Sequence, residues 1–118
     1  MKYLCMIYID ENALQEAPAD LVSAVARECD EHTEELRQEG TFLASERLQP
    51  TSTAITVRTR GDQTTVTDGP FAETKEQLAG FYLIDAADMD EAVRIASHIP
   101  PGRFGCVEAR AVDTGPEA

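Results

Sequence analysis

Residues 2–9 are Lys2-Tyr3-Leu4-Cys5-Met6-Ile7-Tyr8-Ile9, and this stretch decides the fold. Its side chains alternate between two sides, as in a β-strand, and both sides are apolar. Tyr3 and Cys5 begin one side, and Leu4 and Met6 begin the other. A strand that is apolar on both faces is covered on both faces in the folded protein. The sequence therefore predicts a buried first strand with a layer packed on each side.

The remaining elements follow from periodicity and turn residues. After a polar connection over 10–19, the sequence predicts a helix over 20–38, a strand over 41–48, a hairpin over 53–60 and 63–68, an irregular or one-turn segment over 71–77, a strand over 78–85, a helix over 88–98 and a strand over 106–112. Gly40 is suited to end the first helix. Gly61-Asp62 predicts a type II′ turn in the hairpin, and Asp88 is the expected N-cap of the second helix.

This order of elements is the layout of an α+β, ferredoxin-like sandwich with an antiparallel sheet and an inserted hairpin. Two helices cover only one face of such a sheet, yet residues 81–84 are again apolar on both faces. The simplest cover for the second face is a second copy of the chain, so we expect a homodimer. We expect one domain over 1–112 and a frayed tail over 113–118.

Composition excludes several classes of function. The 118 residues carry 22 acidic and 10 basic side chains, a formal charge of −12 that repels nucleic acid and anionic membranes. Cys5, Cys29 and Cys106 are widely spaced, which argues against a disulfide framework or a zinc site, so no metal is expected. The sequence has no glycine-rich loop that could cradle a phosphate, so no cofactor is expected. The apolar N-terminal run is too short for a signal peptide or membrane span, which predicts a cytoplasmic protein.

His32 is the first candidate catalytic residue. At about 100° per residue, it falls inside the apolar stripe of the first helix and points toward the sheet. A histidine in that place can serve as a general acid or base. The alternative is a hydrogen-bonded histidine at the edge of the core. His98, in contrast, falls on the outward side of the second helix.

Asp68 is the second candidate, because a rigid Gly-Pro turn follows it at the end of a predicted strand. It could orient a histidine or bind a ligand, or simply accept amide hydrogens within its turn. Arg58, on the hairpin, and Lys75 are among the few cations of an acidic chain. They could hold an anionic substrate, or pair with the abundant carboxylates.

One long stretch resembles a known family. It reads Asp68-Gly69-Pro70-Phe71-Ala72-Glu73-Thr74-Lys75-Glu76-Gln77-Leu78. It is similar to the DGPF-domain branch of the YCII-related family, as are the opening Met1-Lys2-Tyr3-Leu4 and the closing Gly105-Cys106-Val107. The resemblance implies a ferredoxin-like fold that forms a dimeric α/β barrel.

The resemblance also bears on activity. Some relatives in the wider group are lyase-like or dehalogenating enzymes with a His–Asp pair on the first helix. A gap-free alignment on Gly40 places that histidine at Cys29 and the aspartate at Gln38, so this chain departs from the pair. His32 and Asp68 are the substitute pair we consider. DGPF proteins also resemble partners of extracytoplasmic-function sigma factors.

Two functions therefore stay open. In the first, a dimer encloses a small-molecule pocket in which His32 moves a proton, Asp68 orients it, and Arg58 or Lys75 holds an anionic organic substrate. In the second, the dimer is a ligand-binding or regulatory module without turnover. The DGPF loop, with Phe71, then shapes a contact with a ligand or with a protein such as a sigma factor.

Overall fold

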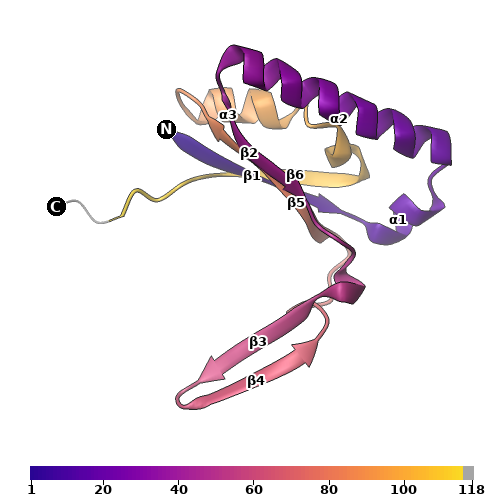
Figure 1. The fold of residues 1–118 in the computed structure, drawn as a ribbon, viewed down its shortest axis with the longest axis vertical. Helices are drawn as coiled ribbons and strands as arrows, with labels where there is room; N and C mark the ends of the chain where they lie inside the picture. The colour runs from indigo at the N-terminus through magenta and orange to yellow at the C-terminus, as the bar shows by residue number, and fades with distance from the viewer. Residues whose placement is uncertain (116–118) are drawn as a thin grey trace.

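A computed structural model describes residues 1–115 of the chain (Figure 1). The elements in order are β1 (Lys2–Ile9), α1 (Glu11–Glu16), α2 (Ala19–Glu39), β2 (Phe42–Arg47), the 3-10 turn η1 (Thr51–Thr53), β3 (Ile55–Arg60), β4 (Gln63–Asp68), β5 (Gln77–Asp85), α3 (Met89–Ala96), the 3-10 turn η2 (Pro100–Phe104) and β6 (Gly105–Ala111). Residues 116–118, the end of the predicted tail, lie outside the described part of the chain.

The main sheet has four strands in the order β2-β5-β1-β6, and every neighbouring pair is antiparallel. Helices α2 and α3 lie over the same face of this sheet (Figure 1). An antiparallel sheet in this order, with two helices on one side, is the ferredoxin-like arrangement. The predicted α+β class, the antiparallel sheet and the inserted hairpin are confirmed.

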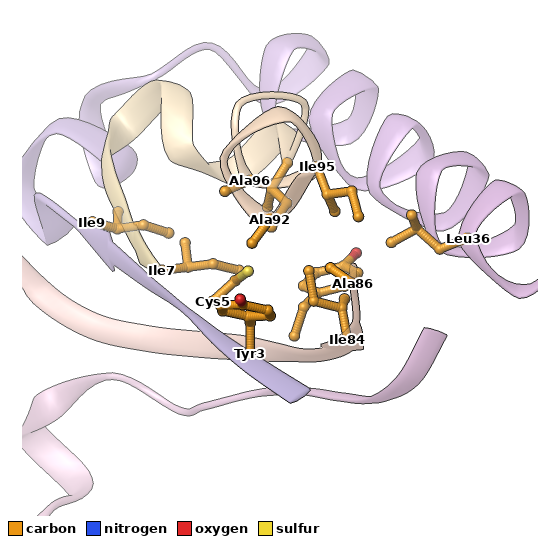
Figure 2. Packing of buried hydrophobic residues seen from close by; sticks show 12 residues of the cluster. Tyr3, Cys5, Ile7, Ile9, Leu36, Ile84, Ala86, Ala92, Ile95 and Ala96 are labelled. Atoms are coloured by element: carbon orange, nitrogen blue, oxygen red, sulfur yellow. The ribbon is translucent and has the colours of Figure 1, made fainter. Parts of the chain in front are cut away.

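The core lies between the helices and one face of the sheet (Figure 2). It joins alternate residues of β1 and β5 to small and branched side chains of α3, namely Tyr3, Cys5, Ile7, Ile9, Tyr82, Ile84, Ala92, Ile95 and Ala96. The opposite face carries Leu4, Met6, Tyr8, Phe81 and Leu83, all half-buried. We call these five residues the uncovered face, because no helix of the described chain packs on it.

The helix ends follow the predicted capping residues. Gly40 ends α2 in the left-handed conformation, with φ of 78°. The Asp88 side chain accepts a hydrogen bond of 2.9 Å from the Glu91 backbone N–H at the start of α3. Such contacts satisfy backbone groups that a helix terminus leaves unpaired.

The polar connection expected over residues 10–19 is wrong in part, because α1 forms within it. Asp10 caps this helix by accepting hydrogen bonds from the Asn12 and Ala13 backbone N–H groups. The Glu11 carboxylate then accepts from the backbone N–H and hydroxyl of Thr51, at 3.0 and 2.6 Å. A six-residue helix is too short to display a helical period, so tertiary contacts decide its conformation.

Strands β3 and β4 form a second, separate sheet that extends away from the rest of the molecule (Figure 1). We call residues 55–68 the arm. Its two-residue turn has Gly61 at φ of 59°, while no non-glycine residue within 1–115 has positive φ. Positive φ at the first turn position alone is the signature of the predicted type II′ turn.

None of the helices within residues 1–115 is long and apolar enough to cross a membrane. No three His, Cys, Asp or Glu side chains in this part of the chain gather in a way that could hold a metal ion.

Candidate functional site

A groove of about 630 Å³ runs between α2 and the edge of the sheet formed by β2 and β5. Its apolar wall includes Ile7, Ile9 and Leu14. Three neutral polar side chains also line the groove, and they are Cys29, Thr33 and Tyr82. A groove of this size with a few convergent polar groups is typical of small-molecule sites.

The three polar side chains form one hydrogen-bonded cluster, which we call the Tyr82 cluster. The Tyr82 Oη atom lies 2.7 Å from Thr33 Oγ1 and 3.0 Å from Cys29 Sγ. The Thr33 hydroxyl also donates to the Cys29 carbonyl oxygen at 2.9 Å. One arrangement uses every hydrogen once: Cys29 donates to Tyr82, Tyr82 to Thr33, and Thr33 to the helix backbone.

Tyr82 is held in a protonated form. Its side chain is 2% exposed, and burial raises the pKa of its hydroxyl well above the usual range. The hydrogen bond with Cys29 raises the pKa further, whereas the bond with Thr33 lowers it. Burial disfavours a phenolate, so Tyr82 is a hydrogen-bond donor and acid rather than a base near neutral pH.

Aromatic neighbours fix the ring of Tyr82. The His32 ring lies on one side with its centroid 6.1 Å away, and the Phe42 ring packs edge-on at 6.2 Å. The Arg37 guanidinium lies 4.8 Å above the Phe42 ring. Cation–π and edge-on contacts of this kind restrict ring motion, so the hydroxyl has a defined position beneath α2.

His32 lies on the other flank of α2, in a hollow of about 350 Å³ between α2 and α3. Its Nε2 atom is buried and has no hydrogen-bond partner within residues 1–115. Burial lowers the pKa of His32, and the nearby Glu35 carboxylate partly opposes this effect. His32 thus points inward, as predicted, while His98 is exposed, also as predicted.

The other predicted site residues lie on or near the arm. Asp68 is exposed at the end of β4 and pairs with Ile55 of β3. Arg58 donates a hydrogen bond of 3.1 Å to the Phe71 carbonyl oxygen, so these two residues do meet. Lys75 is exposed. One copy of the chain does not bring His32 and Asp68 into the same described cavity, and their pairing stays a prediction.

The Tyr82 cluster was not among the residues predicted for the site. Cys29 and Thr33 are four residues apart on one helix face, which could have marked them as neighbours. Tyr82 occupies an inward position of a strand, but spacing alone does not reveal which helix turn its hydroxyl meets. Cys29 is also the position at which the family resemblance aligns the histidine of other members.

Comparisons with known proteins agree with this fold. An uncharacterised protein of Rhizobium meliloti is 41% identical over 96 residues, which are 81% of this chain and 77% of that protein. Among solved structures, 5-chloro-2-hydroxyhydroquinone dehydrochlorinase from Burkholderia phenoliruptrix, in complex with 2,5-dihydroxybenzoquinone, is similar with a TM-score of 0.51. The match covers 98% of this chain and 96% of that one at 14% identity, so the likeness is one of fold. A model of the YCII-related domain matches residues 1–114, and the protein therefore belongs to the YCII-related family.

Proposed function

We propose that this protein binds a small hydroxylated or carboxylated organic molecule in the groove beside α2 and acts on it by proton transfer. The observation that carries the proposal is the buried Tyr82 hydroxyl, 2.7 Å from Thr33 Oγ1 on the wall of that groove. Burial raises its pKa, so Tyr82 keeps its proton near neutral pH and is a weak acid, which passes the proton only to a ligand oxygen on which full negative charge develops.

The groove supports a flat, partly apolar ligand. Ile7, Ile9 and Leu14 offer a surface for a ring, and the volume of about 630 Å³ suits a molecule of that size. Arg37 and Arg47 line the same groove and can hold an acidic oxygen, next to the carboxylates of Asp30, Glu34 and Glu46. The fold neighbour is complexed with a dihydroxybenzoquinone, and this guides the choice of hydroxylated rings as probes.

Proton transfer from Tyr82 leaves a phenolate that must be stabilised. The Thr33 hydroxyl and the Cys29 thiol both lie within hydrogen-bond distance of Tyr82 Oη, and both can rotate to donate to it. Donors already in place where charge develops stabilise a transition state without reorganising solvent. In this scheme Tyr82 is the acid, and Thr33 and Cys29 support its charged form.

A second part of the proposal is a homodimer that closes the uncovered face. Its support is the row of half-buried Leu4, Met6 and Phe81 side chains, which no helix of the same copy covers. A His32–Asp68 pair requires two copies, because the hollow that holds His32 within one copy does not include Asp68. The dimer and the Tyr82 site are independent parts of the proposal.

Thermal shift against a library of small phenols and aromatic acids tests the site. A compound that stabilises the wild type should lose most of its shift in Tyr82→Phe and Thr33→Val. The matched control is Tyr8→Phe, which removes a tyrosine hydroxyl from the uncovered face and should keep the shift. His32→Ala separates the two candidate sites, because loss of binding only in that variant would favour the histidine.

Mass spectrometry of the bound compound then tests turnover. Conversion that stops in Tyr82→Phe supports proton transfer by the hydroxyl. Binding without conversion would favour the second candidate, a regulatory ligand-binding module. Compounds that raise the melting temperature of Tyr82→Phe as much as that of the wild type would contradict the proposed site.

A further inference from the structure

We propose that the arm, residues 55–68, packs against a second copy of the chain and clasps the dimer. This inference rests on the dimer in the proposed function, and it names the arm as the segment of each copy that contacts the other.

Within residues 1–115, the strands of the arm join no other strand of their own copy, and the Arg58 side chain bonds only to the loop that follows the arm. Its two strands pair only with each other, and Figure 1 shows them pointing away from the main sheet. The radius of gyration is 16.3 Å, whereas a compact chain of this length has about 13.5 Å. A two-stranded hairpin alone is at best marginally stable in water. The arm therefore needs another surface to pack on.

One side of the arm carries all of its branched apolar side chains, next to Asp68 and the Thr59–Thr64 pair, and the other side is polar. Val57 and Val66 form a cross-strand pair and are 59% and 65% exposed, and Ile55 on the same side is 62% exposed. The next pair along, Arg58 and Thr65, points to the opposite side. Branched apolar side chains gathered on one exposed face indicate an interaction surface.

The apolar side of the arm continues into the uncovered face of the sheet. A hollow of about 740 Å³ at the base of the arm is lined by Ile55 and Val57 from the arm and by Tyr8 and Leu78 from the sheet. Phe71, 77% exposed, lies on the same wall. A molecule that covers the sheet on this side therefore also meets the arm.

Symmetry favours a second copy as that molecule, and the charge of the arm does not oppose it. Within the arm, Arg58 and Arg60 balance Asp62 and Asp68, so the rest of the chain carries the whole net charge of −12. The acidic parts of two copies repel each other. The neutral arm can approach the acidic surface of a second copy without adding to this repulsion. In a two-fold dimer each arm contact is made twice, which doubles its effect.

Two neighbouring substitutions test the apolar side of the arm. Val66→Asp places a carboxylate on that side, and Thr65→Asp places the same group on the other side. Sedimentation over a range of protein concentrations should give a dimer dissociation constant at least about tenfold weaker for Val66→Asp, as expected for a lost buried valine. Thr65→Asp should stay close to the wild type. Thermal unfolding checks that both variants keep a folded body.

Cross-linking shows where the arm lies. A photoreactive amino acid is placed at Val57, and unlabelled and ¹⁵N-labelled copies are mixed before irradiation. Cross-links between light and heavy peptides are expected. Two results together would overturn the arm proposal and leave the dimer standing: cross-links that form only within one copy, and equal dimer dissociation constants for Val66→Asp and Thr65→Asp. A wild type that is monomeric at every concentration would overturn the dimer itself, and the arm proposal with it.

Discussion

The two faces of the four-stranded sheet come from the same strands but have different fates. Cys5 and Ile84 point toward the helices and are completely buried, whereas their sequence neighbours Leu4 and Leu83 lie half-buried on the uncovered face. Both sets are equally apolar in the sequence. Apolar side chains on both faces of a strand thus predict that both faces are buried. They do not predict what buries each face, which depends on elements elsewhere in the chain or on another copy.

The largest expected effect is on the covered face. Ile84→Ala should lower the free energy of unfolding by about 2–5 kcal/mol, because it leaves a cavity among packed side chains. Leu83→Ala should cost much less at protein concentrations where the chain is monomeric. Urea unfolding of both variants provides the comparison. Equal losses in the monomer would contradict the difference between the faces.

A smaller effect separates two tyrosines. Tyr82→Phe should lower stability by about 0.5–1.5 kcal/mol, because Thr33 and Cys29 lose a buried hydrogen-bond partner. Tyr8→Phe should change little, since the Tyr8 hydroxyl makes a long hydrogen bond to the Met6 sulfur, at 3.8 Å. The same unfolding experiment measures both. A Tyr8→Phe loss as large as that of Tyr82→Phe would show that the hydroxyl on the uncovered face is also engaged.

The stability of the folded protein should also depend on pH through His32, which lies on the side of the sheet that the helices cover. The folded protein lowers the pKa of His32 below its ordinary value of 6.5, so the unfolded chain binds the proton more readily. Stability should therefore be fully present above about pH 6.5 and fall as the pH drops below that value. Unfolding measured across this range should show a slope that His32→Gln removes.

The groups facing His32 provide the control for that experiment. The charged and titratable groups that line its hollow come from three elements: Glu28, Glu31, Glu35 and Glu39 from α2, Arg94 and His98 from α3 and the turn after it, and Arg103 from η2. His98→Gln removes only the repulsion from the other histidine, a smaller cause than burial, so most of the slope should remain. A slope that survives His32→Gln unchanged would assign it to another group.

The smallest effect concerns thiol labelling. Burial raises the pKa of Cys5 to about 11, so iodoacetamide should not label it until the protein unfolds. Cys106 is exposed and pairs with Tyr8 on the side of the uncovered face, so it should react first. Mass spectrometry after timed quenching follows both. Slower labelling of Cys106 at high protein concentration is expected if a second copy covers this side, and a constant rate would contradict that cover.

Much of the fold could be predicted because its signals are local. The strand over 2–9, the glycine that ends α2 and the Gly61-Asp62 turn each carry their information in a few adjacent residues. Helix α1 could not be predicted in this way, since its contact with Thr51 joins segments 40 residues apart. The Tyr82 cluster was missed for the same reason, because its hydrogen bonds join α2 to a strand 49 or more residues later.

The central position of β1 also has a consequence for folding during synthesis. Although β1 is made first, it pairs with β5 and β6, whose earliest paired residue is Gln77. The first strand must therefore wait, unpaired and apolar, until well over half of the chain has left the ribosome. Contacts of such long range slow folding and expose the chain to aggregation. We expect early truncations to be insoluble, and a chaperone that shields residues 2–9 to raise the yield of folded protein.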